Sequence, residues 1–265
     1  MDYSGFDDLV VEVSEGVAVW RINRPERLNA MRTQTFYEII ELGHMLKADD
    51  DVRVVVGTGT GRGLSSGADV GGAVEGEVAP ASSRAESTDS MGVTAIALAM
   101  PSLDKPSIAA VNGVAAGGGM ALACSFDIRI LGPDARFLTV FVRRALAPDC
   151  GLSWFLPRLV GPALANELFF TSREIGVEEA VRIGLGNRIE DDPEAAAIEM
   201  ARELAQGPPL SMMFAKREVQ AAAALTLRDA VEAEWAAQKV ASASDDVREG
   251  MAAFQEKRPP TFRGQ

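Results

Sequence analysis

The sequence predicts an α/β core followed by a helical C-terminal region. From the N-terminus to about residue 135, short apolar segments typical of strands alternate with segments of helical period. The remaining residues are nearly all helical by period and composition. With 265 residues, 47% of them hydrophobic, the chain is long enough to bury a large core.

The first elements are a hairpin, a helix and a buried strand. Residues 9–13 and 17–22 are apolar or alternating and flank the turn Glu15-Gly16, which predicts a β-hairpin. A helix is expected from Thr33 to Ala48, because its large apolar residues recur on one face. Residues 52–56 are continuously apolar, as expected for a buried parallel strand.

Residues 57–72, GTGTGRGLSSGADVGG, predict a glycine-rich loop after that strand. The stretch does not fit the dinucleotide pattern G-x-G-x-x-G from any starting glycine, and it lacks the Gly-Lys-Ser/Thr ending of a phosphate loop. Residues 73–90 are poor in large apolar residues and rich in Gly, Ala, Ser and Glu. We expect a mobile surface segment there that could act as a lid.

The central stretch reads as strand, glycine loop, short helix and strand. Residues 107–111 form a small apolar run, and Gly117-Gly118-Gly119 leads into the helix formers of residues 120–123, before a strand-like pattern at 126–131. A glycine triplet at a helix start exposes backbone N–H groups at the positive end of the dipole. It suits an anion, or an oxygen that becomes anionic during a reaction. A tight turn with close helix–sheet packing explains the triplet equally well.

The rest of the chain is mainly helical. A strand-and-turn region is expected at 135–142, and the turn at 148–151 begins a helix that Gly161-Pro162 ends. Further helices are expected at residues 91–100, 163–170, 177–184, 193–205, 210–224, 227–240 and 245–256.

Charge and composition exclude several classes of function. A net charge of −12 argues against a nucleic-acid surface, which would be basic. Cys124 and Cys150 do not indicate a disulfide scaffold, and no metal-ligand spacing occurs. His44 is the single histidine, so Ser-His-Asp and Cys-His schemes would depend on it alone. The acidic N-terminus lacks a signal-peptide pattern, and no apolar run reaches the ~20 residues of a membrane span, so we expect a cytoplasmic protein.

Four separated motifs together resemble the enoyl-CoA hydratase/isomerase, or crotonase, superfamily. They are NRPERLNAM at residues 23–31, SGAD at 66–69, the stretch 105–127, and REGMAAFQEKRPPTFRG at 248–264. The resemblance implies a crotonase-like spiral of ββα units over residues 1–200 and a helical trimerisation region over 201–265. It further implies a homotrimer or dimer of trimers, an acyl-CoA ligand, and no cofactor beyond the CoA part of the substrate.

The resemblance assigns two backbone N–H groups to the thioester oxygen. By motif position they belong to Ala68 and to Gly118, so both residues would act through the main chain. Two such donors can stabilise a thioester enolate. Ala68 and Asp69 also count among the implied CoA contacts, and Asp69 is expected to hold its loop through local hydrogen bonds.

Further CoA contacts implied by the resemblance lie in the first and last motifs. Arg27, Leu28 and Ala30 match the loop that borders the nucleotide part of CoA. Phe254 and Lys257 match tail positions that reach CoA, often in a neighbouring subunit. From the residues alone, solvated charge explains Arg27 and Lys257, and core packing explains Phe254.

The sequence departs from the family at both hydratase glutamates. Ala121 and Phe141 occupy their positions, and neither side chain can act as an acid or base. Asp149, in a Pro-Asp-x-Gly turn, matches the proton-shuttling aspartate of the isomerase branch and the nucleophile of aryl-CoA dehalogenases. Phe141 is expected to make its surroundings apolar. Alternatively, Asp149 caps a helix beginning at Cys150 or Gly151. We expect Cys150 itself to be a plain buried thiol.

These features favour an enoyl-CoA isomerase in which Asp149 moves the proton. One alternative is an enoyl-CoA hydratase lacking both usual glutamates, or an acyl-CoA thioester hydrolase. A catalytically silent acyl-CoA-binding protein is the other, since Ala121 and Phe141 are what a decayed site would contain.

Overall fold

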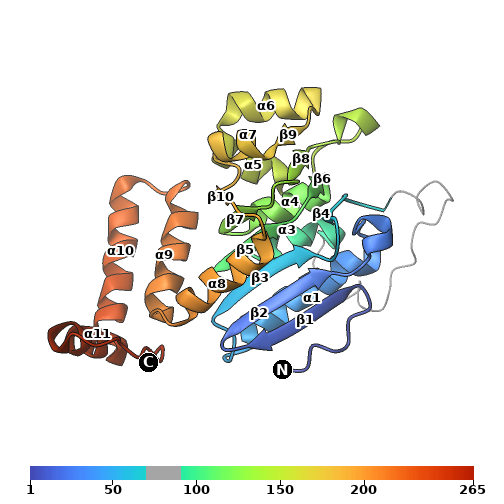
Figure 1. Ribbon diagram of the computed structural model, residues 1–265. Helices are drawn as coiled ribbons and strands as arrows, with labels where there is room; N and C mark the ends of the chain where they lie inside the picture. The colour runs from blue at the N-terminus through green and yellow to red at the C-terminus, as the bar shows by residue number, and fades with distance from the viewer. Residues whose placement is uncertain (70–90) are drawn as a thin grey trace.

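The computed structural model describes residues 1–69 and 91–265, and within them the strands form two sheets (Figure 1). The larger sheet has the order β1 (Leu9–Ser14), β2 (Val17–Ile22), β3 (Val54–Gly59), β5 (Ser107–Val111), β7 (Ile128–Leu131) and β10 (Arg188–Ile189). The smaller sheet has the order β4 (Gly63–Ser65), β6 (Val114–Ala116), β8 (Arg136–Leu138) and β9 (Ile175–Gly176). The lid expected at residues 73–90 lies outside the described residues.

The chain winds between the two sheets in a repeating pattern. β3, β5 and β7 lie parallel in the larger sheet, and each is followed by a strand of the smaller sheet, β4, β6 or β8. The next described α-helices after these strand pairs are α3 (Ile96–Ala99), α4 (Gly118–Ser125) and α5 (Leu152–Val160). The expected spiral of ββα units is therefore confirmed.

The N-terminal hairpin forms the edge of the larger sheet. β1 pairs antiparallel with β2, from Leu9 opposite Ile22 to Ser14 opposite Val17, as predicted. β2 then pairs in parallel with β3, which joins the hairpin to the first turn of the spiral.

Each face of the larger sheet has its own core, because successive strand residues point to opposite sides. Val54 and Val56 pack in one cluster with Ala197 and Ala201 of α8 (Pro193–Ala205). Val55, between them, packs in the other cluster with residues of α1 (Thr33–Ala48) and α4. Thus α8 covers one face, and helices of the spiral cover the other.

The prediction of a glycine-rich loop at residues 57–72 is wrong in its first part. β3 continues through Gly57 to Gly59, and β4 begins at Gly63. A Cβ on Gly57 would lie 2.5 Å from the Phe126 ring, and one on Gly59 would lie 2.2 Å from the Gly63 carbonyl oxygen. Glycine at both positions permits close packing inside strands rather than a turn.

The predicted helices are present, with differences mainly at their ends. α1, α8 and α11 (Asp245–Glu256) have the predicted limits, and α6 (Pro162–Thr171), α7 (Val177–Arg182), α9 (Pro209–Ala222) and α10 (Leu227–Ser242) differ slightly. The helix predicted at 91–100 is a 3-10 turn, η3 (Gly92–Ala95), followed by α3; the other 3-10 turns are η1 (Pro25–Arg27) and η4 (Val142–Arg144). No helix within residues 1–69 and 91–265 is long and apolar enough to cross a membrane.

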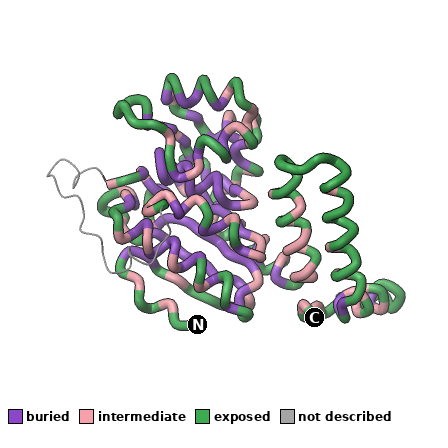
Figure 2. Tube along the Cα trace, turned by 180° about the vertical axis from the view of Figure 1, so that it is seen from behind, coloured by how far each residue is buried: buried purple, intermediate pink, exposed green. Residues whose placement is uncertain are grey.

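The helices α9, α10 and α11 form an arm that projects from one side of the core (Figure 1). α9 and α10 contain no buried residue, and Figure 2 shows the arm as mainly exposed. Its exposed apolar side chains include Val219, Leu227, Val231, Trp235, Val240, Met251 and Phe254. So much exposed apolar surface is typical of a face that another protein surface covers.

An ion pair between a buried lysine side chain and a partly buried aspartate attaches α9 to the core. Lys216 Nζ lies 2.8 Å from Asp127 Oδ2, and the Lys216 side chain is only 6% exposed. The ammonium also donates to the carbonyl oxygens of Met100 at 3.1 Å and Lys105 at 3.0 Å. The backbone N–H and hydroxyl of Ser107 donate to the same Asp127 oxygen. Burial lowers the pKa of Lys216, and the charge of Asp127 opposes that shift.

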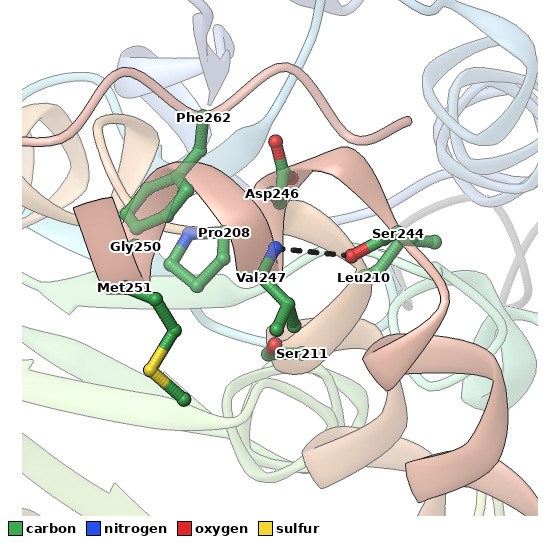
Figure 3. A pocket seen from close by; sticks show the side chains of 9 residues that line it. All are labelled: Pro208, Leu210, Ser211, Ser244, Asp246, Val247, Gly250, Met251 and Phe262. Atoms are coloured by element: carbon green, nitrogen blue, oxygen red, sulfur yellow. Dashed lines mark hydrogen bonds between the residues drawn. The ribbon is translucent and has the colours of Figure 1, made fainter. Parts of the chain in front are cut away.

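The C-terminal tail, which includes Phe262, Arg263 and Gly264, packs against the arm (Figure 3). The Asp246 carboxylate accepts hydrogen bonds from the backbone N–H groups of Arg263 at 2.7 Å and Gly264 at 2.8 Å. Phe262 lines a groove of about 240 Å³ between α9 and α11. Arg53 of the core donates to the Phe262 carbonyl oxygen at 3.0 Å, so the tail also holds the arm to the core.

We predict that Lys216→Ala loosens the arm. The substitution leaves the Asp127 carboxylate without its charge partner, so the free energy of unfolding should fall by about 3 kcal/mol. Amide exchange in α9 and α10 should accelerate while exchange in β3 and β5 stays slow, because the arm opens locally.

The matched control is Arg217→Ala, next to it on α9. Arg217 makes an exposed pair with Asp104 at 2.7 Å, which is worth less than about 1 kcal/mol. If the two variants exchange equally fast in α9, the anchoring role of Lys216 is wrong.

Candidate active site

Two backbone segments from neighbouring turns of the spiral meet beyond the paired strands β4 and β6. Residues 67–69 follow β4, and the glycine triplet follows β6. A Cβ placed on Gly67 would lie 2.7 Å from the Ala116 carbonyl oxygen and 3.6 Å from the Gly118 nitrogen. The structure therefore places the predicted donors, Ala68 and Gly118, on adjacent segments.

Hydrogen bonds fix the backbone around Ala68, and no described residue accepts a hydrogen bond from its own N–H. The Met31 N–H donates to the Gly67 carbonyl at 2.8 Å, and the Asp69 N–H donates to the Met31 carbonyl at 2.9 Å. In such a parallel bridge the N–H of the central residue points away from the bridge partner. Within the described ranges, the Ala68 N–H donates to no other residue, so it can serve a ligand.

Gly118 supplies a second donor, which has no partner among the residues that the structure describes. It is the first residue of α4, so its N–H has no acceptor within the helix and lies at the positive end of the dipole. Gly117 before it has φ 52° and ψ −119°, a conformation suited to glycine. A Cβ on Gly119 would lie 2.4 Å from the Ser65 carbonyl oxygen. The triplet thus provides both a close-packed turn and an open N–H, and the pair of donors can stabilise an oxygen that gains negative charge.

Arg24 joins the loop at residues 23–31 to the segment after β4. Its guanidinium lies 3.1 Å from Asp69 Oδ2 and also donates to the Ala30 carbonyl. Asn29, buried and with φ 53°, donates to two carbonyls of the β3–β4 region. The ion pair supports the prediction that Asp69 holds its loop. Arg24 and Asn29 were not predicted to support the site, although both lie in the NRPERLNAM motif that could have indicated them.

Asp8 interacts with Arg24 and with residues at the start of α1. Its carboxylate accepts hydrogen bonds from Arg32 at 2.8 and 2.9 Å and from the Thr35 hydroxyl, and it lies 3.9 Å from Arg24 Nε. Burial acts to raise the pKa of Asp8, but the hydrogen bonds from Arg32 and Thr35 outweigh it and hold the pKa below its usual range. The burial of Asp8 was not predicted, because no feature of the neighbouring sequence distinguishes it from an exposed acidic residue before a strand.

The two positions that the resemblance matches to the hydratase glutamates hold buried side chains without acid–base chemistry. Ala121, in α4, is 1% exposed and Phe141, before η4, is 6% exposed; both pack in the main core. Asp149, in contrast, is exposed on the turn between η4 and α5. Within the described part of this chain, Asp149 is therefore open to solvent rather than buried.

The alternative role of Asp149 as a helix cap is wrong. α5 begins at Leu152, its N-cap is Gly151, and no side chain caps it. The Leu152 N–H bonds instead to the backbone carbonyl of Asp149 at 3.0 Å. Cys150 and Gly151 have φ of 50° and 78°, so the chain turns before the helix starts. The Asp149 carboxylate is not used by the helix end.

Both thiols are free and buried. Burial raises the pKa of Cys124 to about 12. Burial also raises the pKa of Cys150, and the charge of neighbouring Asp149 adds to that effect. A protonated thiol is a poor nucleophile, which supports the prediction that Cys150 is inert. In residues 1–69 and 91–265, no cluster of His, Cys, Asp and Glu could hold a metal ion.

The predicted CoA contacts fall into two separate places. Arg27, Leu28 and Ala30 lie in and after η1, beside the candidate donors, because the Leu28 carbonyl accepts the Ser66 N–H at 3.0 Å. Phe254 and Lys257 lie at the end of α11 on the arm, far from β4 in Figure 1. Within one chain the structure does not bring the two groups together.

Comparisons with known proteins agree with this geometry. A family model described as enoyl-CoA hydratase/isomerase matches residues 12–265. The chain is 34% identical to 1,2-epoxyphenylacetyl-CoA isomerase of Escherichia coli (strain K12), over 97% of this chain and 98% of that protein. It is 33% identical to crotonyl-CoA hydratase of Syntrophomonas wolfei, over 97% and 98%. The 1.8 Å crystal structure of enoyl-CoA hydratase from Bacillus anthracis matches with a TM-score of 0.87 at 27% identity, over 98% and 100%.

We predict that Asp8→Asn destabilises the protein at neutral pH by about 2 kcal/mol, because Arg32 and Arg24 lose a buried counter-charge. The folded pKa of Asp8 is lowered, so its stabilisation is present above the unfolded value of about 3.9 and is lost as pH falls through the folded value. Denaturant unfolding from pH 7 to pH 3 should therefore show the parent and the variant converging in acid. The control is Asp7→Asn at the exposed neighbouring position, and a constant difference at all pH values would contradict the prediction.

Proposed function

The chain belongs to the enoyl-CoA hydratase/isomerase family of acyl-CoA-processing enzymes, and from this premise we propose that it is an enoyl-CoA isomerase. One observation carries the choice of isomerase. Ala121 and Phe141 stand where two glutamates would position water, while the Asp149 carboxylate is exposed and unused by the helix after it. Similarity to 1,2-epoxyphenylacetyl-CoA isomerase supports the same choice.

In the proposed reaction, Asp149 removes a proton from C2 of a 3-enoyl-CoA. The electron pair of that C–H bond moves into the thioester carbonyl and gives an enolate, whose oxygen accepts hydrogen bonds from the N–H groups of Ala68 and Gly118. The carboxylic acid then returns the proton to C4, and the double bond moves to C2–C3. Each preorganised donor can lower the barrier by ~3–4 kcal/mol. An exposed carboxylate can reach a substrate without a change in the surrounding fold.

Hydration of 2-enoyl-CoA is the second candidate, because crotonyl-CoA hydratase is similar over nearly the whole chain. Without glutamates at positions 121 and 141, water would have to be activated by another group, and the exposed carboxylate of Asp149 is the candidate for that role. Hydration incorporates the oxygen of labelled water into the product, whereas isomerisation does not.

We further propose that other copies of this chain cover the apolar face of the arm, in a homotrimer or a dimer of trimers. The exposed Val231, Trp235 and Phe254 support this proposal, since an arm with so little buried surface is poorly stabilised alone. Such an assembly would also carry Phe254 and Lys257 to the CoA of a neighbouring copy. It would account for their distance from Arg27 in one chain.

We predict that Asp149→Asn lowers isomerisation of 3-hexenoyl-CoA at least 100-fold, because the amide cannot accept the proton. The rate is measured by following the conjugated 2-enoyl-CoA product, in parallel with uptake of labelled oxygen. Asp134→Asn removes another exposed carboxylate and should keep the parent rate. If Asp149→Asn keeps the parent rate, Asp149 does not transfer the proton. Labelled oxygen in the main product would favour the hydratase.

We predict that Trp235→Arg lowers the oligomer mass in sedimentation velocity, because a charge replaces a large apolar contact on α10. Arg228→Ala, in an exposed pair of the same helix, is the control and should keep the parent mass. A monomeric parent protein at micromolar concentration would refute the assembly proposal.

A further inference from the structure

Val140, between β8 and η4, has a backbone conformation that a β-branched residue rarely adopts. Its φ is 52°, in the left-handed region that favours glycine. The Phe141 N–H donates to the Thr139 carbonyl at 2.8 Å, so Val140 is the central residue of a γ-turn, and the positive φ makes it the strained form of that turn. Strain of this kind persists only where the surrounding structure fixes it, and it is concentrated at functional sites.

The residues on both sides of Val140 are fixed in the core. Thr139 is 1% exposed, and its hydroxyl donates to the Leu168 carbonyl at 2.9 Å. Phe141 packs in the main core, and its carbonyl oxygen accepts the Arg144 N–H at 2.9 Å. Val140 itself is only half-buried. The turn therefore keeps the Val140 side chain partly outside the core, while both of its neighbours are buried.

The Val140 side chain lies against the glycine triplet. β8 pairs in parallel with β6, and the Gly117 N–H donates to the Leu138 carbonyl at 2.9 Å. A Cβ placed on Gly117 would lie 3.1 Å from Val140 Cγ2. Among the described residues beyond the chain neighbours of Gly117, no other atom lies within 4 Å of that position. Val140 is thus the side chain that packs on the open face of Gly117.

This contact affects the direction of the Gly118 N–H. The carbonyl of Gly117 and the N–H of Gly118 share one peptide plane, and rotation about ψ of Gly117 turns that plane. Gly117 has φ 52° and ψ −119°, and it has no side chain of its own to restrict the rotation. The Ala121 N–H donates to the Gly117 carbonyl at 2.9 Å and holds one end of the plane. Val140 packs against the other end, at the Gly117 Cα.

We infer that Val140 is a positioning residue that keeps the Gly118 N–H directed at the thioester oxygen. The inference rests on the proposed function, which places that oxygen at Gly118. Val140 acts through Gly117 and exchanges no proton with the substrate. Its strained conformation lowers the stability of the fold, and in return the donor is already oriented when negative charge develops on the oxygen.

The first test compares variants that remove the contact with one that keeps it. Val140→Ala and Val140→Gly both lose the Cγ2 methyl group. Each should lower kcat for 3-hexenoyl-CoA about tenfold and leave KM nearly unchanged, because the donor acts mainly in the transition state. Val140→Ile keeps the methyl group and should retain the parent kcat. Val142→Ala is the matched control, because Val142 is exposed on η4, and it should also retain the parent kcat.

Thermal unfolding separates positioning from simple packing. Val140→Gly should unfold at a higher temperature than Val140→Ala, because glycine accepts the positive φ and alanine does not. If Val140 positions the donor, the more stable glycine variant is no more active than the alanine variant, since both lack the contact. A kcat that rises with unfolding temperature across the two variants would contradict the positioning role.

The second test observes the donor by infrared spectroscopy. Hexanoyl-CoA labelled with ¹³C at its carbonyl is saturated and unreactive, and its bound carbonyl should absorb at a lower frequency than in solution, because two N–H groups polarise it. Val140→Gly should move this frequency back toward the solution value, whereas Val140→Ile and Val142→Ala should not. The same bound frequency in the parent and in Val140→Gly would overturn the inference.

The outcomes distinguish this inference from the proposed reaction. If the carbonyl frequency depends on Val140 but no enoyl-CoA is turned over, the reaction fails and the positioning role stands. If the parent and Val140→Gly isomerise 3-hexenoyl-CoA equally fast and show the same carbonyl frequency, the positioning role fails and the reaction stands.

Discussion

Close contact between backbone segments of consecutive turns is the constraint on which this structure depends. An added Cβ atom would lie 2.2 Å from the Arg62 carbonyl oxygen at Gly113 and 2.4 Å from the Ser65 carbonyl oxygen at Gly119. Only glycine permits such approaches, so the spiral can form only with glycine at these places. The same contacts bring the Ala68 and Gly118 amides beside each other. Fold and candidate site therefore follow from one packing requirement.

The candidate site is consequently made of main chain held by a charged framework. Arg24, Asp69 and Asp8 fix the loops from one side, and α4 presents its first N–H groups from the other. Because the donors are amides, the fold can keep them while side chains around them vary. In the proposed isomerase reaction, Asp149 moves the proton, while Ala121 and Phe141 contribute no acid–base chemistry.

Features with local causes could be predicted from the sequence. The limits of α8 follow from Asp192, whose side chain accepts the Ala195 N–H, and from its apolar period. Strands β4, β9 and β10 could not be predicted, since two or three residues become a strand only through their neighbours. Gly57 and Gly59 look like loop residues until Phe126 and Gly63 are seen against them. Likewise, the Arg24–Asp69 pair joins residues that are distant in the chain, and nothing in the sequence marks the two positive φ angles that follow Asp149.

The spiral topology also bears on how the chain reaches its native state. β3 pairs with β5, and β5 with β7, so each new turn must close the loop between two strands before its own strand gains a partner. Loop-closure entropy of this kind slows folding much more than it lowers final stability. Until the second turn closes, apolar strands such as β5 have an unpaired edge exposed to other chains. The arrangement that places two amides side by side thus makes nascent chains vulnerable to aggregation.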